Sequence, residues 1–431
     1  MTDHNATPWS RRLFLQQGAT LASLVATTPM FIERSARGMM LPLGSLVTSQ
    51  AGVPEDRVLV VVQLGGGNDG LNSVVPYGSD AYYRLRPSLG IARPGTGADA
   101  ALQLDANAGL GLHPSLRGIK ELMDEGSAGI VQGVGYPNPN RSHFSSMDIW
   151  HSADVNGTNN GWIGRYFDNT CSGTPDPEAG IAIGRQAPLA MQGATQMPVS
   201  FERSELFRWM GTDLDGNLEH PYDTIADTQH TGELKEADSQ SAFLKRTTMD
   251  ARVSSDRVRK AVGTTPLVTY PNSNLSNQLR MVAAMIRAEM RTRVYYVTLG
   301  GFDTHANQAQ QHARLLEQVG DALLAFQRDL QAQGNQGRVM TMVFSEFGRR
   351  VAQNGSGGTD HGTAAPMYFI GENVMPGVHG MHPSMERLDS GDLVHTIDFR
   401  TLYSTVLQDW MGADSTQILG GKWNTVPLLR T

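Results

Sequence analysis

The chain has 431 residues, of which 40% are hydrophobic and 18% charged, with a formal net charge of −7. This composition is typical of a globular protein with a sizeable core, and the acidic balance excludes the usual basic kind of nucleic-acid-binding protein. Cys171 is the single cysteine and cannot form an internal disulfide, which suits a chain that folds in a reducing compartment even if it is exported afterwards.

Residues 1–51 predict a twin-arginine export signal. Arg11 and Arg12 precede a mildly apolar run that polar residues interrupt. A membrane-spanning helix needs about 20 predominantly apolar residues, so we expect this run to be cleaved, or at most to anchor the chain. The alternative is a chance arginine pair before an amphipathic helix. The best small-residue cleavage site lies in "TSQAGV", where Ser49 and Ala51 take the small positions.

The predicted export signal has consequences for charge and location. Removing residues 1–51 takes away four arginines and two acidic residues, so the mature chain carries about −9 rather than −7. We expect the twin-arginine export machinery as a partner, a periplasmic or secreted location, and no membrane span in the mature chain.

The mature chain, residues 52–431, alternates strand and helix patterns. Five apolar runs predict buried strands of the kind found in parallel sheets: residues 57–64, 128–135, 293–299, 338–344 and 365–371. Amphipathic helices are predicted between them, at about residues 115–126, 272–290 and 306–334. This order predicts an α/β fold, a mostly parallel sheet sandwiched by helices.

Residues 172–270 depart from this rhythm. They contain few strong strand patterns, frequent Pro and Gly, and charge runs such as "ELKEADSQ". We interpret the segment as an insertion or cap packed beside the sheet. A long surface excursion without a role at the site is an equally good interpretation.

Polar clusters follow the predicted strands, at the carboxyl edge where open α/β sheets bind ligands. The first strand is followed by "GGGNDGLN", which sets Asp69 in a glycine-rich turn. The turn lacks the Lys and Ser or Thr of a phosphate-binding loop, and its carboxylate would repel a phosphate unless a cation lay between them. Asp69 is therefore a candidate metal ligand, or simply a turn former.

Two later strands also end in candidate metal ligands. Asp303 and His305 follow the third predicted strand and offer a carboxylate and an imidazole to one ion. Asp303 could instead cap the next helix. Glu346 follows the fourth strand. Asp360 and His361 follow a glycine-rich loop that is long enough for the chain to return to the same edge of the sheet.

Two further clusters offer sites for an anion. Arg349 and Arg350 could clamp an anionic oxygen, or pair with a neighbouring carboxylate. Arg141, Ser142 and His143 open a predicted helix, whose N-terminus stabilises anions and favours an activated hydroxyl. Ser142 is a candidate nucleophile or an ordinary helix cap.

Together these motifs resemble those of the alkaline phosphatase and sulfatase superfamily, in which such positions hold one or two divalent metals and a nucleophile. More narrowly, they resemble the bacterial export family called domain of unknown function 1501. The motifs that carry the resemblance span nearly the whole mature chain: "VVQLGGGNDGLN", "NRSHFSSMDIWHS", "GGFDTHANQ", "SEFGRR" and "TDHGTAAPMYFIG". An alkaline phosphatase-like fold is implied.

The resemblance implies metal ligands at six positions: Asp69, Asp303, His305, Glu346, Asp360 and His361. Phe347 departs from the superfamily pattern, because many members carry an imidazole there. No hydroxyl or thiol occupies the usual nucleophile position near residues 138–140, so Ser142 is the nearest substitute. One or two divalent ions are expected, and mixed carboxylate and imidazole ligands favour zinc or manganese slightly over calcium or magnesium.

The implied activity is metal-dependent hydrolysis of phosphate or sulfate esters, on an anionic small molecule or polymer. Ser142 would attack the ester, with Arg141 or Arg349 neutralising the anion. Without that nucleophile, water activated by the metal would attack, with Glu346 or His143 as general base. The competing hypotheses are a metal- or anion-binding protein on the same scaffold without turnover, and a surface protein whose cap binds partners.

Overall fold

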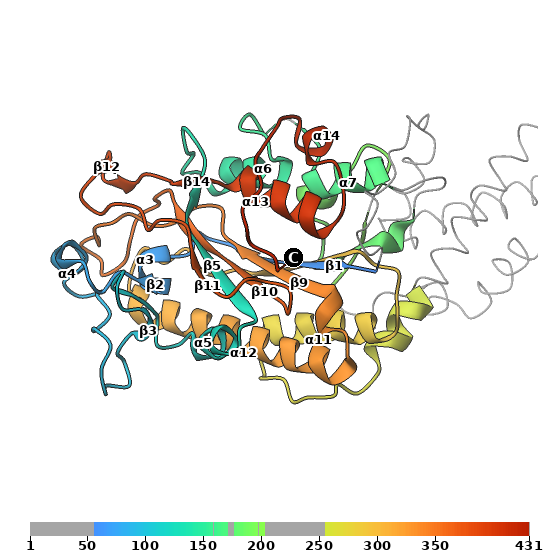
Figure 1. The fold of residues 1–431 in the computed structure, drawn as a ribbon, viewed down its shortest axis with the longest axis horizontal. Coiled ribbons are helices and arrows are strands. Elements are labelled where there is room, and N and C mark those ends of the chain that lie inside the picture. Colours follow the sequence, from blue (N-terminus) through green and yellow to red (C-terminus); the bar gives the residue numbers. More distant parts are fainter. Residues whose placement is uncertain (1–55, 158, 171–175, 197, 203–254, 431) are drawn as a thin grey trace, which may run out of the picture.

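The computed structural model describes residues 56–430 except 158, 171–175, 197 and 203–254. These residues build a nine-stranded sheet in the order β11-β5-β10-β9-β1-β8-β6-β7, with β14 paired to β5 (Figure 1). The strands are β1 (Val58–Leu64), β5 (Ala128–Gly135), β6 (Gly180–Ile183), β7 (Val199–Phe201), β8 (Val294–Leu299), β9 (Val339–Phe344), β10 (Ala365–Ile370), β11 (Gly377–His379) and β14 (Ile397–Asp398).

The sheet is mostly parallel, as the sequence predicts. Among the described strands, β10 is the exception, since it runs antiparallel to both β9 and β5. The run at 365–371 was expected to be one more parallel strand. A parallel neighbour needs a crossover connection, usually a helix, whereas residues 345–364 between β9 and β10 form no helix. β10 therefore begins at the edge where β1, β8 and β9 end.

Helices cover both faces of the sheet (Figure 1). One layer contains α5 (Arg117–Asp124), α11 (Asn274–Arg287) and α12 (Gln308–Gln333), and the other contains α6 (His143–Ser152), α7 (Trp162–Thr170), α13 (Phe399–Thr405) and α14 (Ser415–Leu419). Alternate residues of β1 supply the two cores, because side chains of a strand point to opposite faces. Val60 and Val62 pack toward the first helix layer, and Leu59 and Val61 toward the second.

The described structure also contains short elements. A three-stranded sheet contains β2 (Val74–Val75), β3 (Leu102–Asp105) and β4 (Leu110–Leu112), and a hairpin pairs β12 (Leu388–Asp389) with β13 (Asp392–Leu393). The short helices are α3 (Gly70–Ser73), α4 (Asp80–Leu85), the 3-10 turns η1 (Pro177–Ala179), η2 (Leu189–Met191) and η5 (Gln336–Arg338), and the π-helical turn η6 (Val406–Trp410).

Local capping residues determine where the long helices begin and end. Ser273 caps α11 by accepting a hydrogen bond from the backbone N–H of Ser276. Gly334 ends α12 in the left-handed conformation, with φ of 73°, which glycine adopts at little cost. Asn307, not Asp303, takes the N-cap position of α12, so the Asp303 side chain is available for another role.

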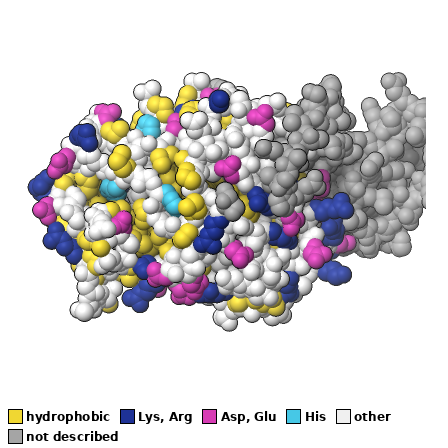
Figure 2. All heavy atoms as spheres, viewed as in Figure 1, with side chains coloured by type: hydrophobic (Ala, Val, Ile, Leu, Met, Phe, Trp, Pro, Cys, Tyr) yellow, Lys and Arg dark blue, Asp and Glu magenta, His cyan; other side chains and the backbone are white. Residues whose placement is uncertain are grey.

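Part of the expected insertion belongs to the sheet itself. Within residues 172–270, β6 and β7 extend the sheet beyond β8. Residues 203–254 of that segment, the arginine pair and the expected cleavage site lie outside the described residues. In the described part of the chain, no helix is long and apolar enough to cross a membrane. Basic and acidic side chains are interspersed over the described face in Figure 2.

Candidate metal centre

Loops from neighbouring strands meet at the carboxyl edge of the sheet. β1 lies between β8 and β9 and is parallel to both, so the loops that follow these three strands converge. Gly66 and Gly67 allow the close approach, since their φ angles are 118° and 76° and such values favour glycine. A Cβ atom on Gly66 would lie 2.5 Å from the backbone nitrogen of Asp303, and one on Gly67 would lie 2.4 Å from the Phe347 ring.

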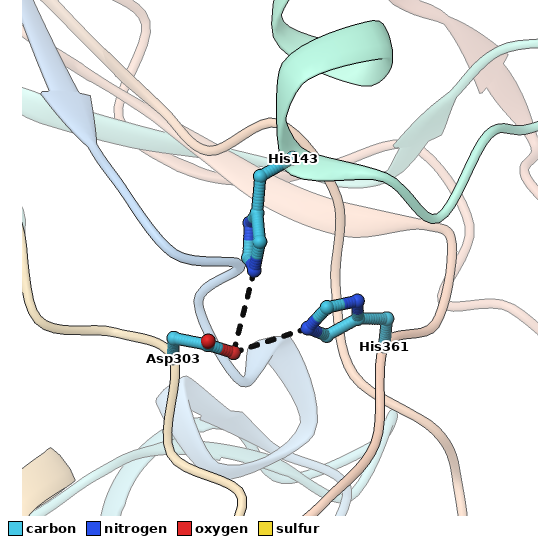
Figure 3. Close-up of side chains that lie close together, drawn as sticks. All are labelled: His143, Asp303 and His361. Atoms are coloured by element: carbon cyan, nitrogen blue, oxygen red, sulfur yellow. Dashed lines mark hydrogen bonds and ion pairs between the residues drawn. The ribbon is translucent and has the colours of Figure 1, made fainter.

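His143, Asp303 and His361 form the centre of the site (Figure 3). His143 comes from the first turn of α6, and His361 lies in the loop before β10. The Nε2 atoms of His361 and His143 lie 3.1 and 3.4 Å from Oδ1 of Asp303. The three candidate ligand atoms lie within 4.8 Å of one another. His305 adds a third imidazole, with Nε2 at 3.0 Å from the same oxygen and 2.9 Å from Nε2 of His361.

The outer nitrogen of each central imidazole is fixed by a hydrogen-bond acceptor. Nδ1 of His143 lies 2.8 Å from Oε1 of Glu346, and Nδ1 of His361 lies 2.8 Å from the carbonyl oxygen of Arg141. Because these oxygens accept, each Nδ1 carries a proton, and the neutral form of each ring then has its lone pair on Nε2. Metal-binding histidines usually have this second hydrogen bond.

The inner atoms fit a divalent cation. Two unprotonated Nε2 atoms face a carboxylate oxygen, an arrangement that repels unless a cation lies among them. Nε2 of His143 is buried and has no hydrogen-bond partner in the described part of the chain. Three carboxylates surround these atoms, those of Asp303, Glu346 and Asp360, and the charges of Arg349 and Arg350 act on Asp303 and Asp360 respectively.

Arg349 holds Asp303 from behind the centre. Its Nη2 atom lies 2.7 Å from Oδ1 of Asp303, and its side chain is fully buried. All three guanidinium nitrogens donate to the protein, including to the carbonyl oxygens of Gly67 and Thr359. Partial burial alone would raise the pKa of Asp303, but the hydrogen bond and the charge of Arg349 outweigh it and hold that pKa well below its usual range. Arg349 thus supports the carboxylate and lies out of reach of a bound anion.

Glu346 and Asp360 lie behind imidazoles rather than among the inner atoms. Glu346 is 2% exposed, and its Oε1 accepts from the backbone N–H of Gly66 as well as from His143. Asp360 lies outside His305, with 3.4 Å between its Oδ1 and Nδ1 of the ring. Both carboxylates were expected as ligands, and their geometry is that of groups that orient a histidine.

Asp69 lies in a buried ion pair one layer away. Its Oδ2 atom is 2.5 Å from Nη1 of Arg86, both side chains are fully buried, and Gln308 donates to the same oxygen. Burial alone would raise the pKa of Asp69, but the charge and hydrogen bond of Arg86 outweigh it, and the pKa is lowered. Asp69 is absent from the group of candidate ligands that includes His143. Nothing in the spacing of the sequence marks Arg86 as its partner.

The remaining predicted residues open α6. Ser142 takes the N-cap position and is exposed, but its hydroxyl makes no capping hydrogen bond. The side chain of Arg141 forms an ion pair with Asp392 in β13, while its backbone supports His361. His143, expected as a general base, instead directs Nε2 toward Asp303.

A family model matches residues 56–422, which include every residue of this centre. The chain belongs to the family described as Protein of unknown function (DUF1501). The family expected from the five motifs is thereby confirmed for this DUF1501 protein. No curated protein matches it.

Solved structures similar to the DUF1501 chain include sulfatases and phosphatases. The PsFucS1 sulfatase from Pseudoalteromonas sp. is 9% identical with a TM-score of 0.38, and the match covers 96% of this chain and 74% of that one. The C-terminal periplasmic domain of EcEptC from Escherichia coli, in complex with Zn, is 8% identical with a TM-score of 0.36 over 76% and 78%. Alkaline phosphatase from the Antarctic bacterium TAB5 is 10% identical with a TM-score of 0.30 over 75% and 94%. Likeness this distant says nothing about activity.

Proposed function

We propose that the chain is an exported, metal-dependent hydrolase of phosphate or sulfate esters. The observation that carries the proposal is the convergence of imidazole Nε2 atoms on one oxygen of Asp303, with the outer nitrogens of His143 and His361 already held by acceptors. Imidazole nitrogens and a carboxylate oxygen held close together in this way are groups that bind a divalent metal ion in proteins.

The proposed ligands are Nε2 of His143, Nε2 of His361 and the carboxylate of Asp303. Imidazole nitrogen together with carboxylate oxygen suits zinc or manganese, whereas calcium and magnesium prefer oxygen ligands. One ion is favoured over two, because Arg86 already neutralises Asp69, the carboxylate expected to hold the other ion.

The protein's own groups then perform the reaction. A bound divalent ion supplies a Lewis acid for the oxygens of the ester. His305 is 44% exposed and takes a proton at Nε2 from the attacking water, while Asp360 holds its Nδ1. The water oxygen bonds to phosphorus or sulfur, the bond from that atom to the ester oxygen breaks, and the departing alcohol takes up the proton that Nε2 of His305 received from the water.

Direct attack by water is favoured over attack by Ser142. A serine nucleophile needs a base within hydrogen-bond reach. His143, the imidazole next in sequence, directs Nδ1 to Glu346 and Nε2 toward Asp303, so neither nitrogen is available to Ser142. We therefore expect no covalent intermediate.

The second candidate is a metal- or anion-binding protein without turnover. The unsupported hydroxyl of Ser142 favours it, because an active site that has lost its nucleophile would have this geometry. Both candidate functions require a bound metal ion, but only the hydrolase cleaves an ester.

Metal content of the folded, leader-free protein, measured by mass spectrometry, tests both. We expect one ion per chain, lost in the Asp303→Ala, His361→Ala double variant and retained in the surface control Asp80→Asn. Release of phosphate or sulfate from aryl esters by the metal-loaded protein, absent from the double variant, supports the hydrolase. A bound ion without ester cleavage supports the binding protein, and the absence of metal from the wild-type protein contradicts both.

A further inference from the structure

A cavity of about 370 Å³ opens beside the metal centre. One wall is the loop between β5 and α6, and the other is the hairpin of β12 and β13. Glu346 and Phe347 also line it, and both contact His143, the first by a hydrogen bond and the second with 4.9 Å between ring centroids. A group in this cavity would therefore lie next to the centre.

A buried carboxylate ties the hairpin to the loops of the centre. Asp392 in β13 is 1% exposed, and its Oδ2 accepts from Arg141. Nε of Arg350 lies 3.6 Å from the other oxygen, Oδ1, which is too far for a hydrogen bond. Oδ1 has no hydrogen-bond partner in the described part of the chain. A buried oxygen in this state requires a donor.

Trp150, which also lines the cavity, has an unpartnered donor within the described part of the structure. Trp150 in α6 is 2% exposed and is held between aromatic rings, with centroid distances of 5.2 Å to Phe344 and 4.4 Å to Phe399. Its indole N–H has no hydrogen-bond partner among the described residues. Buried indole groups usually find a partner, so a ligand that accepts a hydrogen bond would satisfy it.

The charges of the lining limit the ligand further. Three carboxylates line the cavity, those of Glu346, Asp389 and Asp392, against one guanidinium, that of Arg141. A second phosphate or sulfate would be repelled here. A hydroxyl group, by contrast, both donates and accepts, which matches a free carboxylate oxygen and a free indole N–H.

We propose that this cavity binds a neutral, hydroxylated group, such as a sugar ring or another polyol, with Trp150 and Asp392 as its hydrogen-bonding residues. This assignment rests on the proposed function: the group is the alcohol part of the ester, and the anionic part of the ester lies at the metal centre. The substrate class is then a monoester of a polyol, and polyphosphates, whose further anionic groups would enter the cavity, are excluded by charge.

The test follows the indole N–H signals of the tryptophans in ¹⁵N-labelled, leader-free protein by NMR. The Trp150→Phe variant keeps an aromatic ring in the stack, lacks the N–H, and identifies the signal. Methyl glucoside and methyl galactoside are the neutral probes, and methyl glucuronide, which adds a carboxylate to the same kind of ring, is the anionic one. We expect a neutral probe to shift the Trp150 signal in the millimolar range, and methyl glucuronide to leave it unchanged because the lining carboxylates repel its charge.

Variants then assign the contacts. We expect Trp150→Phe and Asp392→Asn each to weaken binding of the neutral probe about tenfold, the size of one lost hydrogen bond, measured by calorimetry. Asp80→Asn, at a surface ion pair, serves as the matched control. No shift with either neutral probe, or equal affinity in the wild type and both variants, overturns the proposal.

The same titration in Asp303→Ala separates this proposal from the proposed function. Asp303 does not line the cavity, so the variant should bind the neutral probe with unchanged affinity while its metal is lost. Probe binding without ester cleavage by the wild type would contradict the hydrolase and leave the cavity assignment intact. Ester cleavage without probe binding would contradict only the cavity assignment.

Discussion

Nδ1 of His143 lies 2.8 Å from Oε1 of Glu346, although the two residues are 203 positions apart in the chain. Oε1 also accepts from the backbone N–H of Gly66, so a second hydrogen bond holds the carboxylate in place. This pairing joins the start of α6 to the end of β9 and orients the nitrogen that faces Asp303.

The first prediction concerns this pairing. Replacing Glu346 by Gln removes the charge that makes His143 a better ligand, and we expect metal affinity to fall about 10- to 100-fold. Competition with a chromophoric chelator measures the change. Glu372→Gln, at an exposed position, is the matched control. Equal affinity in Glu346→Gln and the wild type would show that Glu346 does not orient a ligand.

A second prediction distinguishes His305, the proposed general base, from His361, a proposed metal ligand. His305→Ala should retain the metal while ester cleavage falls about 100-fold or more, the usual contribution of a general base. His361→Ala should lose the metal itself. Ser142→Ala should keep activity close to that of the wild type, because its hydroxyl has no base. Loss of metal from His305→Ala would make His305 a ligand, and loss of activity from Ser142→Ala would restore the covalent route.

The third prediction concerns Asp69. Asp69→Asn leaves the buried guanidinium of Arg86 without its counter-charge, and breaking a buried pair in this way costs about 3–5 kcal/mol in the free energy of unfolding. Urea unfolding measures the loss. Metal content should stay at one ion per chain when measured on the folded protein. Asp80→Asn removes a carboxylate from an exposed pair, with side-chain exposures of 58% for Arg93 and 88% for Asp80, and should change stability little. A loss of metal from Asp69→Asn would return Asp69 to the ligand set.

A fourth prediction follows from a buried histidine. Burial lowers the pKa of His151 to about 4, whereas the unfolded chain has the ordinary value of about 6.5. Between these values the unfolded state binds more protons than the folded state, so stability falls as the pH drops from about 6.5 toward 4.

Urea unfolding at pH 7 and at pH 5 tests this in the wild type and in His151→Gln. The variant removes one proton-binding group, so it should lose less stability between the two pH values than the wild type does. An equal loss in both proteins would mean that His151 does not contribute to the acid sensitivity.

The fifth prediction concerns export. Replacing Arg11 and Arg12 by lysines should keep the protein in the cytoplasm, since the twin-arginine signal is recognised through its arginines. Cell fractionation and immunoblotting measure the distribution. Arg34→Lys with Arg37→Lys changes as many arginines in the same leader and should leave export unaffected. Export of the Arg11, Arg12 variant would contradict the proposed route.

Patterns in the sequence predicted the long elements of the fold well. The run "RVLVVVQL" became β1 because its apolar residues fill cores on both faces of the sheet. β6 and β7 were missed, since strands of four and three residues are too short to show a period. The direction of β10 was missed as well, because apolar character is the same whichever way a strand runs.

The site was predicted in part, for a physical reason. Residues after parallel strands share one edge of the sheet, so Asp303, His305 and His361 were expected together and do lie together. Which group faces an ion and which supports it depends on the directions of side chains, which spacing does not give. In the structure Nε2 of His143 faces Asp303, and Glu346 lies behind that ring. Arg86 was missed because no motif marks a buried counter-charge.

The antiparallel direction of β10 has a consequence for how the protein is held together. The chain leaves the sheet through β9, passes His361, and returns through the adjacent strand, so this candidate ligand lies on a loop that the sheet holds at both ends. His143 and Asp303 come from other parts of the chain, and all three meet only once the sheet is complete. An ion bound there would act as a crosslink among distant segments, and its binding free energy would add to the stability of the folded state. The metal would then bind only after the sheet has folded, and its removal would destabilise the loops at the carboxyl edge of the sheet.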